Sequence, residues 1–513
     1  MKMENDRFVV YGNAIEKSHS QKAIKWQNMF VKKFNYDPNE KYSLSLEDNP
    51  YLGPLFGLRN IVRKEEGEPV KNEKAVICST IRMGFGHYRI AMAGVSCARA
   101  MGFQPYWLDL LAIPGITTDV INRCNTNYSA CSRFSQRSRL FEKYVWEAVT
   151  TGEPTLPVLS HFLNSWIPGW PWRFLKTNVK DYKMSELFRN MFQALPPEMP
   201  ILTSHMWICM GAVAGGMTNV VDMMFDNWPM AFQLTEGAKH AVQSPSGYYG
   251  FRVMRGFDER DKILKPVPTD ALIYAGHHVD HELVENIEID CAARLRRMKN
   301  NEPRRLLLTM GGAGAQRELF KAIIEHCIPL IKKGKVCLFV NLGDHKSNWE
   351  WLKTELSQHD ELVQPHFNWQ ETQSFVDSIR DQVADGLHVF LHDNTFHAVY
   401  STNYLMRVVD VMITKPSELA FYPVPKIFNA RVGGHEMWGA IRGAELGDGT
   451  IEARSIIQTI QAIDILTEEN DLLQLFCACI QKNKSIGIYD GGYKCVELAT
   501  GKKFDRVDGK AVY

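Results

Sequence analysis

Short apolar runs alternate with longer amphipathic segments from Lys74 to Leu110 and again from Pro200 onward. Runs such as Val76–Ser79 and Val408–Ile413 are almost entirely apolar and are bounded by turn residues, which is typical of strands buried on both faces of a parallel sheet. The segments between such runs, for example Leu319–Ile331, carry apolar residues at helical spacing. Strands that alternate with helices in this way predict an α/β fold with parallel sheets.

The same rhythm divides the chain into two lobes. A chain of 513 residues is too long for one ordinary core, so we expect two similar domains. We place the first domain at residues 73–268 and the second at residues 269–490. An insertion without the strand–helix rhythm occupies about 111–200. A polar extension at 1–72 is expected to cover the first domain as an extra layer, and a tail at 491–513 to pack back across the domains.

Composition narrows the function classes. The chain is 45% hydrophobic and 23% charged with a net charge of +1, so nothing favours a nucleic-acid partner. Its 11 cysteines are dispersed and form no CxxC pair, which argues against a metal site and a disulfide framework and favours the reducing cytoplasm. No signal-like segment begins the chain, and no uncharged run reaches the ~18 residues that span a bilayer. We expect a protein without resident metal, soluble or peripheral on a membrane.

A glycine-bearing loop, Gly84-Phe85-Gly86-His87, follows the first buried strand of the first domain. His87 is therefore expected at the amino end of a helix, where exposed N–H groups and the helix dipole disfavour an imidazolium. A neutral imidazole is what a general base requires near pH 7. His87 is the candidate catalytic residue, and the plainer alternative is a histidine that caps the helix without chemistry.

A second glycine loop, GGAGAQ, lies between the predicted strand Leu306–Met310 and the helix after it. Main-chain N–H groups in such a loop can bind a phosphate. Gly311, Gly312 and Gly314 lack the Cβ atoms that would block this approach, and Gln316 could add a side-chain contact. The alternative is a tight turn that serves only the packing of helix against strand.

Two further strand-to-helix junctions lie about twenty residues apart near the end of the second domain. The first reads Thr414-Lys415-Pro416-Ser417-Glu418, and the second, after the predicted strand Lys426–Phe428, reads Gly433-Gly434-His435-Glu436. Each junction carries a carboxylate. Ligands of open α/β sheets bind at the carboxyl edge, where both junctions are expected to lie.

Taken together, these segments resemble GT-B glycosyltransferases, in particular the lipid-directed group that includes monogalactosyldiacylglycerol synthase and the N-acetylglucosaminyltransferase of peptidoglycan lipid precursors. ITKPSELAFYPVPKI and GGHE are similar to the donor-binding signature of that group, and GFGH is similar to its first-domain GGH loop. The chain departs from the group in two ways. About five fewer residues separate Pro416 from Glu418, and His435 stands in place of a glutamine.

The resemblance implies two Rossmann-like domains with a cleft between them. It also implies an inverting transfer of a sugar from a nucleotide-sugar, of the UDP-sugar type, to an acceptor hydroxyl. The donor is then a substrate, and no cofactor is expected. His87 would take the acceptor proton, and Glu418 would bind the ribose. The donor would be bound by Gly311, Gly312, Gly314, Gln316, Lys415, Ser417, Glu418, His435 and Glu436, and Gly86 and Asp226 would contact substrate.

The predicted insertion contains a tryptophan-rich segment, Phe162–Tyr182, with lysine and arginine beside Trp166, Trp170 and Trp172. This composition is typical of a membrane-interface segment, and it also suits an apolar acceptor cleft or a packing lid between the domains. We expect Trp170 and Trp172 to contact an acceptor that is a lipid or a membrane-surface glycan.

Two other functions fit the same residues. One is a nucleotide-sugar epimerase or hydrolase, which would use the same donor without an acceptor. The other is a nucleotide-sugar-binding scaffold without turnover, which the short segment before Glu418 and the histidine at His435 would favour.

Overall fold

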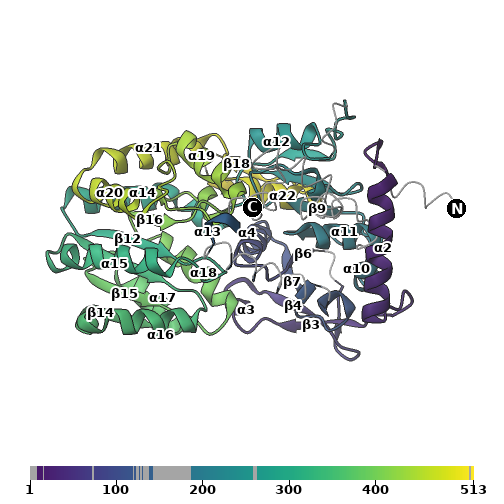
Figure 1. Ribbon diagram of the computed structural model, residues 1–513, viewed down its shortest axis with the longest axis horizontal. Coiled ribbons are helices and arrows are strands. Elements are labelled where there is room, and N and C mark those ends of the chain that lie inside the picture. The colour runs from purple at the N-terminus through teal and green to yellow at the C-terminus, as the bar shows by residue number, and fades with distance from the viewer. Residues whose placement is uncertain are drawn as a thin grey trace.

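The computed structural model describes residues 9–15, 17–71, 74–119, 186–257, 263–507 and 510–512, and isolated positions and short pieces between 121 and 141. Within these residues the chain forms two domains that lie side by side along the long axis of the molecule, each built around one sheet (Figure 1). Among the helices described, none is both long enough and apolar enough to cross a membrane.

The first domain contains a nine-stranded sheet in the order β11-β10-β9-β8-β6-β7-β4-β3-β5. All neighbours from β11 to β4 pair in parallel, and β3 pairs antiparallel with β4 and β5. The strands are β3 (Leu44–Asp48), β4 (Arg59–Arg63), β5 (Glu68–Pro69), β6 (Ala75–Thr80), β7 (Gln104–Asp109), β8 (Ile201–Thr203), β9 (Val220–Met223), β10 (Lys239–Val242) and β11 (Leu272–Tyr274).

The predicted extension at 1–72 is more than a covering layer. Its strands β3, β4 and β5 extend the sheet itself, because β4 pairs in parallel with β7. Leu46 of β3 and Ile61 of β4 are buried, whereas the charged residues of the two strands are exposed or half-buried. Helix α2 (Lys17–Phe34) lies on the outer side of the domain, at the far right of Figure 1.

Helices cover both faces of this sheet. Helix α4 (Gly86–Ala100) begins where expected and is almost completely buried between the domains. Helix α11 (Met206–Ala214) begins directly after His205, whose side chain accepts a hydrogen bond from the Trp207 N–H and caps the helix. Helices α10 (Glu186–Phe192) and α12 (Pro245–Arg252) also belong to this domain.

The second domain contains a six-stranded, fully parallel sheet in the order β14-β15-β13-β12-β16-β17. Its strands are β12 (Arg304–Thr309), β13 (Val336–Asn341), β14 (Val363–His366), β15 (Gly386–Phe390), β16 (Val411–Thr414) and β17 (Lys426–Phe428). Its helices are α14 (Ile287–Lys299), α15 (Arg317–Lys332), α16 (Lys346–Glu355), α17 (Trp369–Ser378), α18 (Thr395–Met406), α19 (Met437–Leu446), α20 (Ile456–Glu468) and α21 (Asp471–Ser485).

The chain crosses between the domains twice. After β11 the short helix α13 (His281–Glu285) leads into the second domain, and after α21 the helix α22 (Gly491–Thr500) returns to the first. There α22 packs against α4 and strands β8 to β10, close enough that a Cβ on Gly492 would lie 2.7 Å from the Cys97 Sγ. The predicted fold class, α/β with two Rossmann-like domains built on parallel strands, is confirmed.

Candidate active site between the two domains

A pocket of about 160 Å³ lies where the carboxyl edges of the two sheets face each other. Eleven of the predicted site residues line it: Gly86, His87, Asp226, Gly311, Gly312, Gln316, Lys415, Ser417, Glu418, His435 and Glu436. Gly314 belongs to the same loop but does not line the pocket, and a Cβ there would meet the side chains of His345 and Asn348 at 3.0 Å. Trp170 and Trp172 lie outside the described residues.

The first-domain wall is the loop between β6 and α4. Gly84 has a φ of 90°, a left-handed conformation that glycine adopts without strain and that turns the chain from strand to helix. No side chain caps the amino end of α4. Its first N–H groups therefore have no partner within the helix and are available to an acceptor at the pocket.

His87 lies in the first turn of α4 and lines the pocket. Its Nδ1 is 2.5 Å from the Ser204 carbonyl oxygen, to which it donates, so Nε2 is the basic nitrogen of the neutral ring. The rings of His205 and Phe225 pack against it at centroid distances of 4.8 and 4.6 Å. Burial lowers the pKa of His87 to about 4, although the Ser204 carbonyl and the Glu418 carboxylate oppose the shift. The imidazole is therefore neutral at pH 7.

The second-domain wall is the glycine loop between β12 and α15. No side chain caps α15, so its first N–H groups are also available to a ligand. Gln316 itself donates through Nε2 to the Ala430 carbonyl at 2.6 Å. Its side-chain amide thus ties the loop to the segment after β17, and the predicted role at the donor remains a proposal.

Two residues that the sequence did not single out fix the shape of this loop. His345 donates from Nε2 to the Gly311 carbonyl at 3.0 Å, and Asn348 donates from Nδ2 to the Gly314 carbonyl at 3.0 Å. His345 precedes α16, the first helix after β13, and Asn348 lies in the first turn of that helix. Their position after a buried strand is the only signal in the sequence that could have drawn attention to them.

Lys415 and Glu436 form an ion pair at the far side of the pocket. The other carboxylate oxygen of Glu436 accepts from the N–H groups of Val432 and Gly433 at 2.8 and 3.3 Å. Burial alone would raise the pKa of Glu436, but Lys415, His435 and these hydrogen bonds outweigh it and hold the pKa below its ordinary value. The Glu436 carboxylate therefore stays ionised and holds the Val432–Glu436 turn in place.

Two other carboxylates face the pocket without an ion pair of their own among the described residues. Glu418 opens a single 3-10 turn, Glu418–Phe421, where the sequence predicted a helix after Pro416. Asp226 follows β9, and burial raises its pKa to about 6 even though His435 lowers it. Asp226 can therefore change its protonation state close to neutral pH.

The domains are in close contact around this pocket. A Cβ on Gly312 would lie 2.3 Å from the Phe85 nitrogen, so the two glycine loops touch through their main chains. Arg82 pairs with Asp344 at 3.0 Å across the gap. Buried Arg89 in α4 donates to side-chain oxygens of the second domain at 3.1 Å. The structure therefore shows the closed arrangement of the domains.

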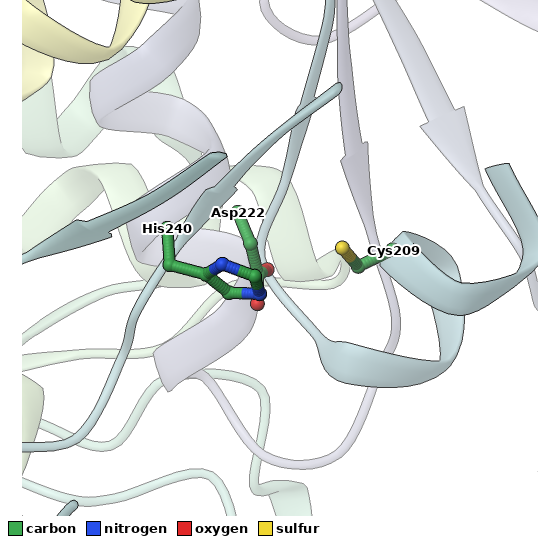
Figure 2. A group of neighbouring side chains, drawn as sticks. All are labelled: Cys209, Asp222 and His240. Carbon is green, nitrogen blue, oxygen red and sulfur yellow. The ribbon is translucent and has the colours of Figure 1, made fainter. Parts of the chain in front are cut away.

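One cluster outside the pocket has the residue types of a metal site: Cys209, Asp222 and His240, whose ligand atoms lie within 4.8 Å of one another (Figure 2). Both ring nitrogens of His240 already form hydrogen bonds, so neither is available to bind a metal ion. Its Nε2 accepts from the Thr235 N–H at 2.9 Å, and its Nδ1 donates to the Ala271 carbonyl at 3.1 Å. The donor set does not fit a metal ion, and the cluster is a hydrogen-bonded part of the core.

Comparisons with known proteins give the following matches. Residues 9–253 match a family model described as a domain of unknown function (DUF6937), and residues 267–500 match another described as a domain of unknown function (DUF6938). No curated protein matches the chain.

Similar solved structures include both epimerases and transferases. UDP-GlcNAc 2-epimerase from Neisseria meningitidis, bound to UDP-GlcNAc, has 12% identity and a TM-score of 0.41, covering 83% of this chain and 100% of its own. The α,α-trehalose 6-phosphate synthase from Burkholderia multivorans has 11% identity and a TM-score of 0.41, covering 83% and 98%. WaaG, a glycosyltransferase involved in lipopolysaccharide biosynthesis, has 11% identity and a TM-score of 0.36, covering 83% and 100%.

Proposed function

We propose that this protein binds a nucleotide-sugar, of the UDP-sugar type, between its domains and transfers the sugar to an acceptor hydroxyl with inversion. One observation carries the proposal. A single pocket joins a neutral imidazole, His87, to two glycine loops that begin helices without side-chain caps. These parts come from both domains and are more than 200 residues apart in the sequence.

The diphosphate of the donor is proposed to lie on the loop that contains Gly311 and Gly312 and on the first turn of α15. N–H groups without partners and the positive end of the helix dipole favour an anion there. The ammonium of Lys415 is already paired with Glu436. Main-chain N–H groups are therefore the main source of stabilisation for the charge that develops on the leaving diphosphate.

His87 is proposed to act as the general base. Its Nε2 lone pair accepts the proton of the acceptor hydroxyl while that oxygen bonds to the anomeric carbon. The bond from this carbon to the diphosphate oxygen breaks on the opposite face, so the configuration inverts. The donation from Nδ1 to Ser204 keeps the ring in the tautomer that this step requires.

The acceptor is proposed to be a lipid or a membrane-surface glycan, with the protein cytoplasmic and peripheral to the membrane. The tryptophan-rich segment 162–182 and the dispersed cysteines support this assignment. Flotation of the protein with anionic liposomes tests it. Replacement of Trp166, Trp170 and Trp172 by alanine should abolish flotation, and unchanged flotation would remove the lipid contact.

A second candidate is an epimerase or hydrolase that acts on the same donor. Asp226 favours it, because a carboxyl whose pKa is about 6 can serve as a second acid or base beside His87. Incubation of UDP-sugars without any acceptor separates the two functions. An epimer or free sugar among the products would favour this candidate over the transferase.

Calorimetry with UDP, followed by turnover assays with UDP-sugars, tests the proposal as a whole. We expect UDP to bind and at least one UDP-sugar to be consumed faster when lipid or glycan acceptors are present. If neither UDP nor any UDP-sugar gives heat, the pocket is not a nucleotide-sugar site and the proposal is wrong.

A further inference from the structure

Glu418 lies close to the first turn of α4. It follows Pro416 by two residues and opens a turn of only four residues. A Cβ on Gly86 would lie 3.1 Å from Glu418 Oε2 and 3.3 Å from its carboxyl carbon. The carboxylate therefore reaches across the domain gap to the residue that precedes His87.

The surroundings of His87 leave Glu418 as its main charged neighbour from the second domain. From the first domain, His87 meets the neutral Ser204 carbonyl and the buried ring of His205, whose pKa burial lowers well below its ordinary value. Asp226 lines the same pocket from the segment after β9. Lys415 lines the pocket from the second domain and is paired with Glu436.

We infer that Glu418 is a positioning residue for the base: its carboxylate lies beside His87 when the domains close and stabilises the imidazolium that forms as the hydroxyl proton arrives. This inference rests on the proposed function and deepens it. A carboxylate near an imidazole favours the protonated ring, which offsets the cost that burial imposes on that charge. Because Glu418 belongs to the opposite domain, His87 gains this help only in the closed form.

The absence of a side chain at Gly86 leaves room for the Glu418 carboxylate beside His87. Gly86 does not have a positive φ, so an alanine could adopt its backbone conformation without strain. The added methyl would instead meet the flexible end of Glu418 and push the carboxylate away. Gly86→Ala thus displaces the charge that Glu418→Gln removes, and two independent variants test one contact.

The experiment compares Glu418→Gln with the wild-type protein in UDP binding and in the dependence of kcat on pH. We expect the Kd for UDP to stay within about twofold and the plateau of kcat to fall roughly 3- to 10-fold, because the base is weaker. Removing the carboxylate lowers the pKa of His87, so the acid limb of the profile should move to lower pH. Gly86→Ala should move the acid limb in the same direction.

Glu355→Gln is the matched control, since Glu355 pairs with Lys321 on the surface of α16 and should change neither quantity. A Kd for UDP raised tenfold or more in Glu418→Gln, with an unmoved acid limb, would assign Glu418 to the ribose and overturn the inference. If the wild-type protein neither binds UDP nor turns over a UDP-sugar, the proposed function fails, and the inference fails with it.

Discussion

Gly312→Ala tests the contact between the two glycine loops in solution. The added Cβ would lie 2.3 Å from the Phe85 nitrogen and 2.5 Å from the Gly84 Cα, and both are main-chain atoms that no rotamer change can move. Unstrained contacts of this kind are about 3.5–4 Å, so the loops must separate by about 1 Å. Gly312 is not among the glycines in the left-handed region, so its own backbone accepts alanine. The whole effect therefore falls on the contact between domains.

Inserting a methyl group into a packed contact costs about 1–3 kcal/mol. For domains of this size each kcal/mol lowers Tm by about 2–4 °C, so we expect a fall of a few degrees. The closed form should also be less populated, and small-angle scattering should show a larger radius of gyration. Both quantities are measured on the unliganded protein and again with UDP.

Gly334→Ala is the control for this experiment. Gly334 lies in the same domain with a φ of 67°, and a Cβ there would meet no atom within 4 Å. Its substitution should cost about 1 kcal/mol of backbone strain without changing the radius of gyration. If Gly312→Ala leaves both Tm and the radius of gyration unchanged, the two loops do not touch in solution and the closed pocket described above is wrong.

Three further variants give separate tests. His87→Gln should lower turnover about 10²- to 10⁴-fold, because an amide cannot take the acceptor proton, while calorimetry gives an unchanged Kd for UDP; a smaller loss would contradict the assignment of the base. Burial raises the pKa of Asp222 from 3.8 to about 7. Between about pH 4 and 7 the folded protein therefore keeps a proton on Asp222 that the unfolded chain has released. The free energy of unfolding consequently falls as the pH rises through this range. Asp222→Asn removes this loss, on the order of 4 kcal/mol, and its Tm advantage should be larger at pH 8 than at pH 5; an equal advantage at both would refute the reasoning. Asp410→Ala should cost about 3–5 kcal/mol in chemical denaturation, because it leaves buried Arg297, whose Nη2 is 2.8 Å from Asp410, without its partner; a loss below about 1 kcal/mol would contradict this.

That His87, Gly312 and Glu418 lie in one pocket was predictable from the sequence, because the parallel strands that they follow were predictable. Each residue follows a buried apolar run, and the ends of parallel strands meet at one edge of a sheet. Strand β17 was predicted at exactly its observed bounds, Lys426–Phe428, since prolines on its amino side and a turn on its carboxyl side delimit it. A local sequence pattern was sufficient to predict a strand wherever prolines or turn residues mark both of its ends.

Contacts that depend on how distant segments adjoin were not predictable. The sequence predicted that Lys415 and Glu436 both lie at the donor site, but it did not predict their ion pair, which forms because β16 and β17 are adjacent. His345 acts on the glycine loop only because β13 lies beside β12. The edge strands at 44–69 were missed because charged residues interrupt their apolar pattern.

The path of α22 bears on how the protein is made. This helix covers the face of a sheet whose strands end at β11, and the whole second domain is synthesised in between. At a translation rate of about 5–20 residues per second, the first domain therefore waits roughly 10–45 s with apolar surface exposed. During that interval its uncovered face is a natural substrate for a chaperone, and a pause in synthesis before Gly491 would prolong the risk of aggregation.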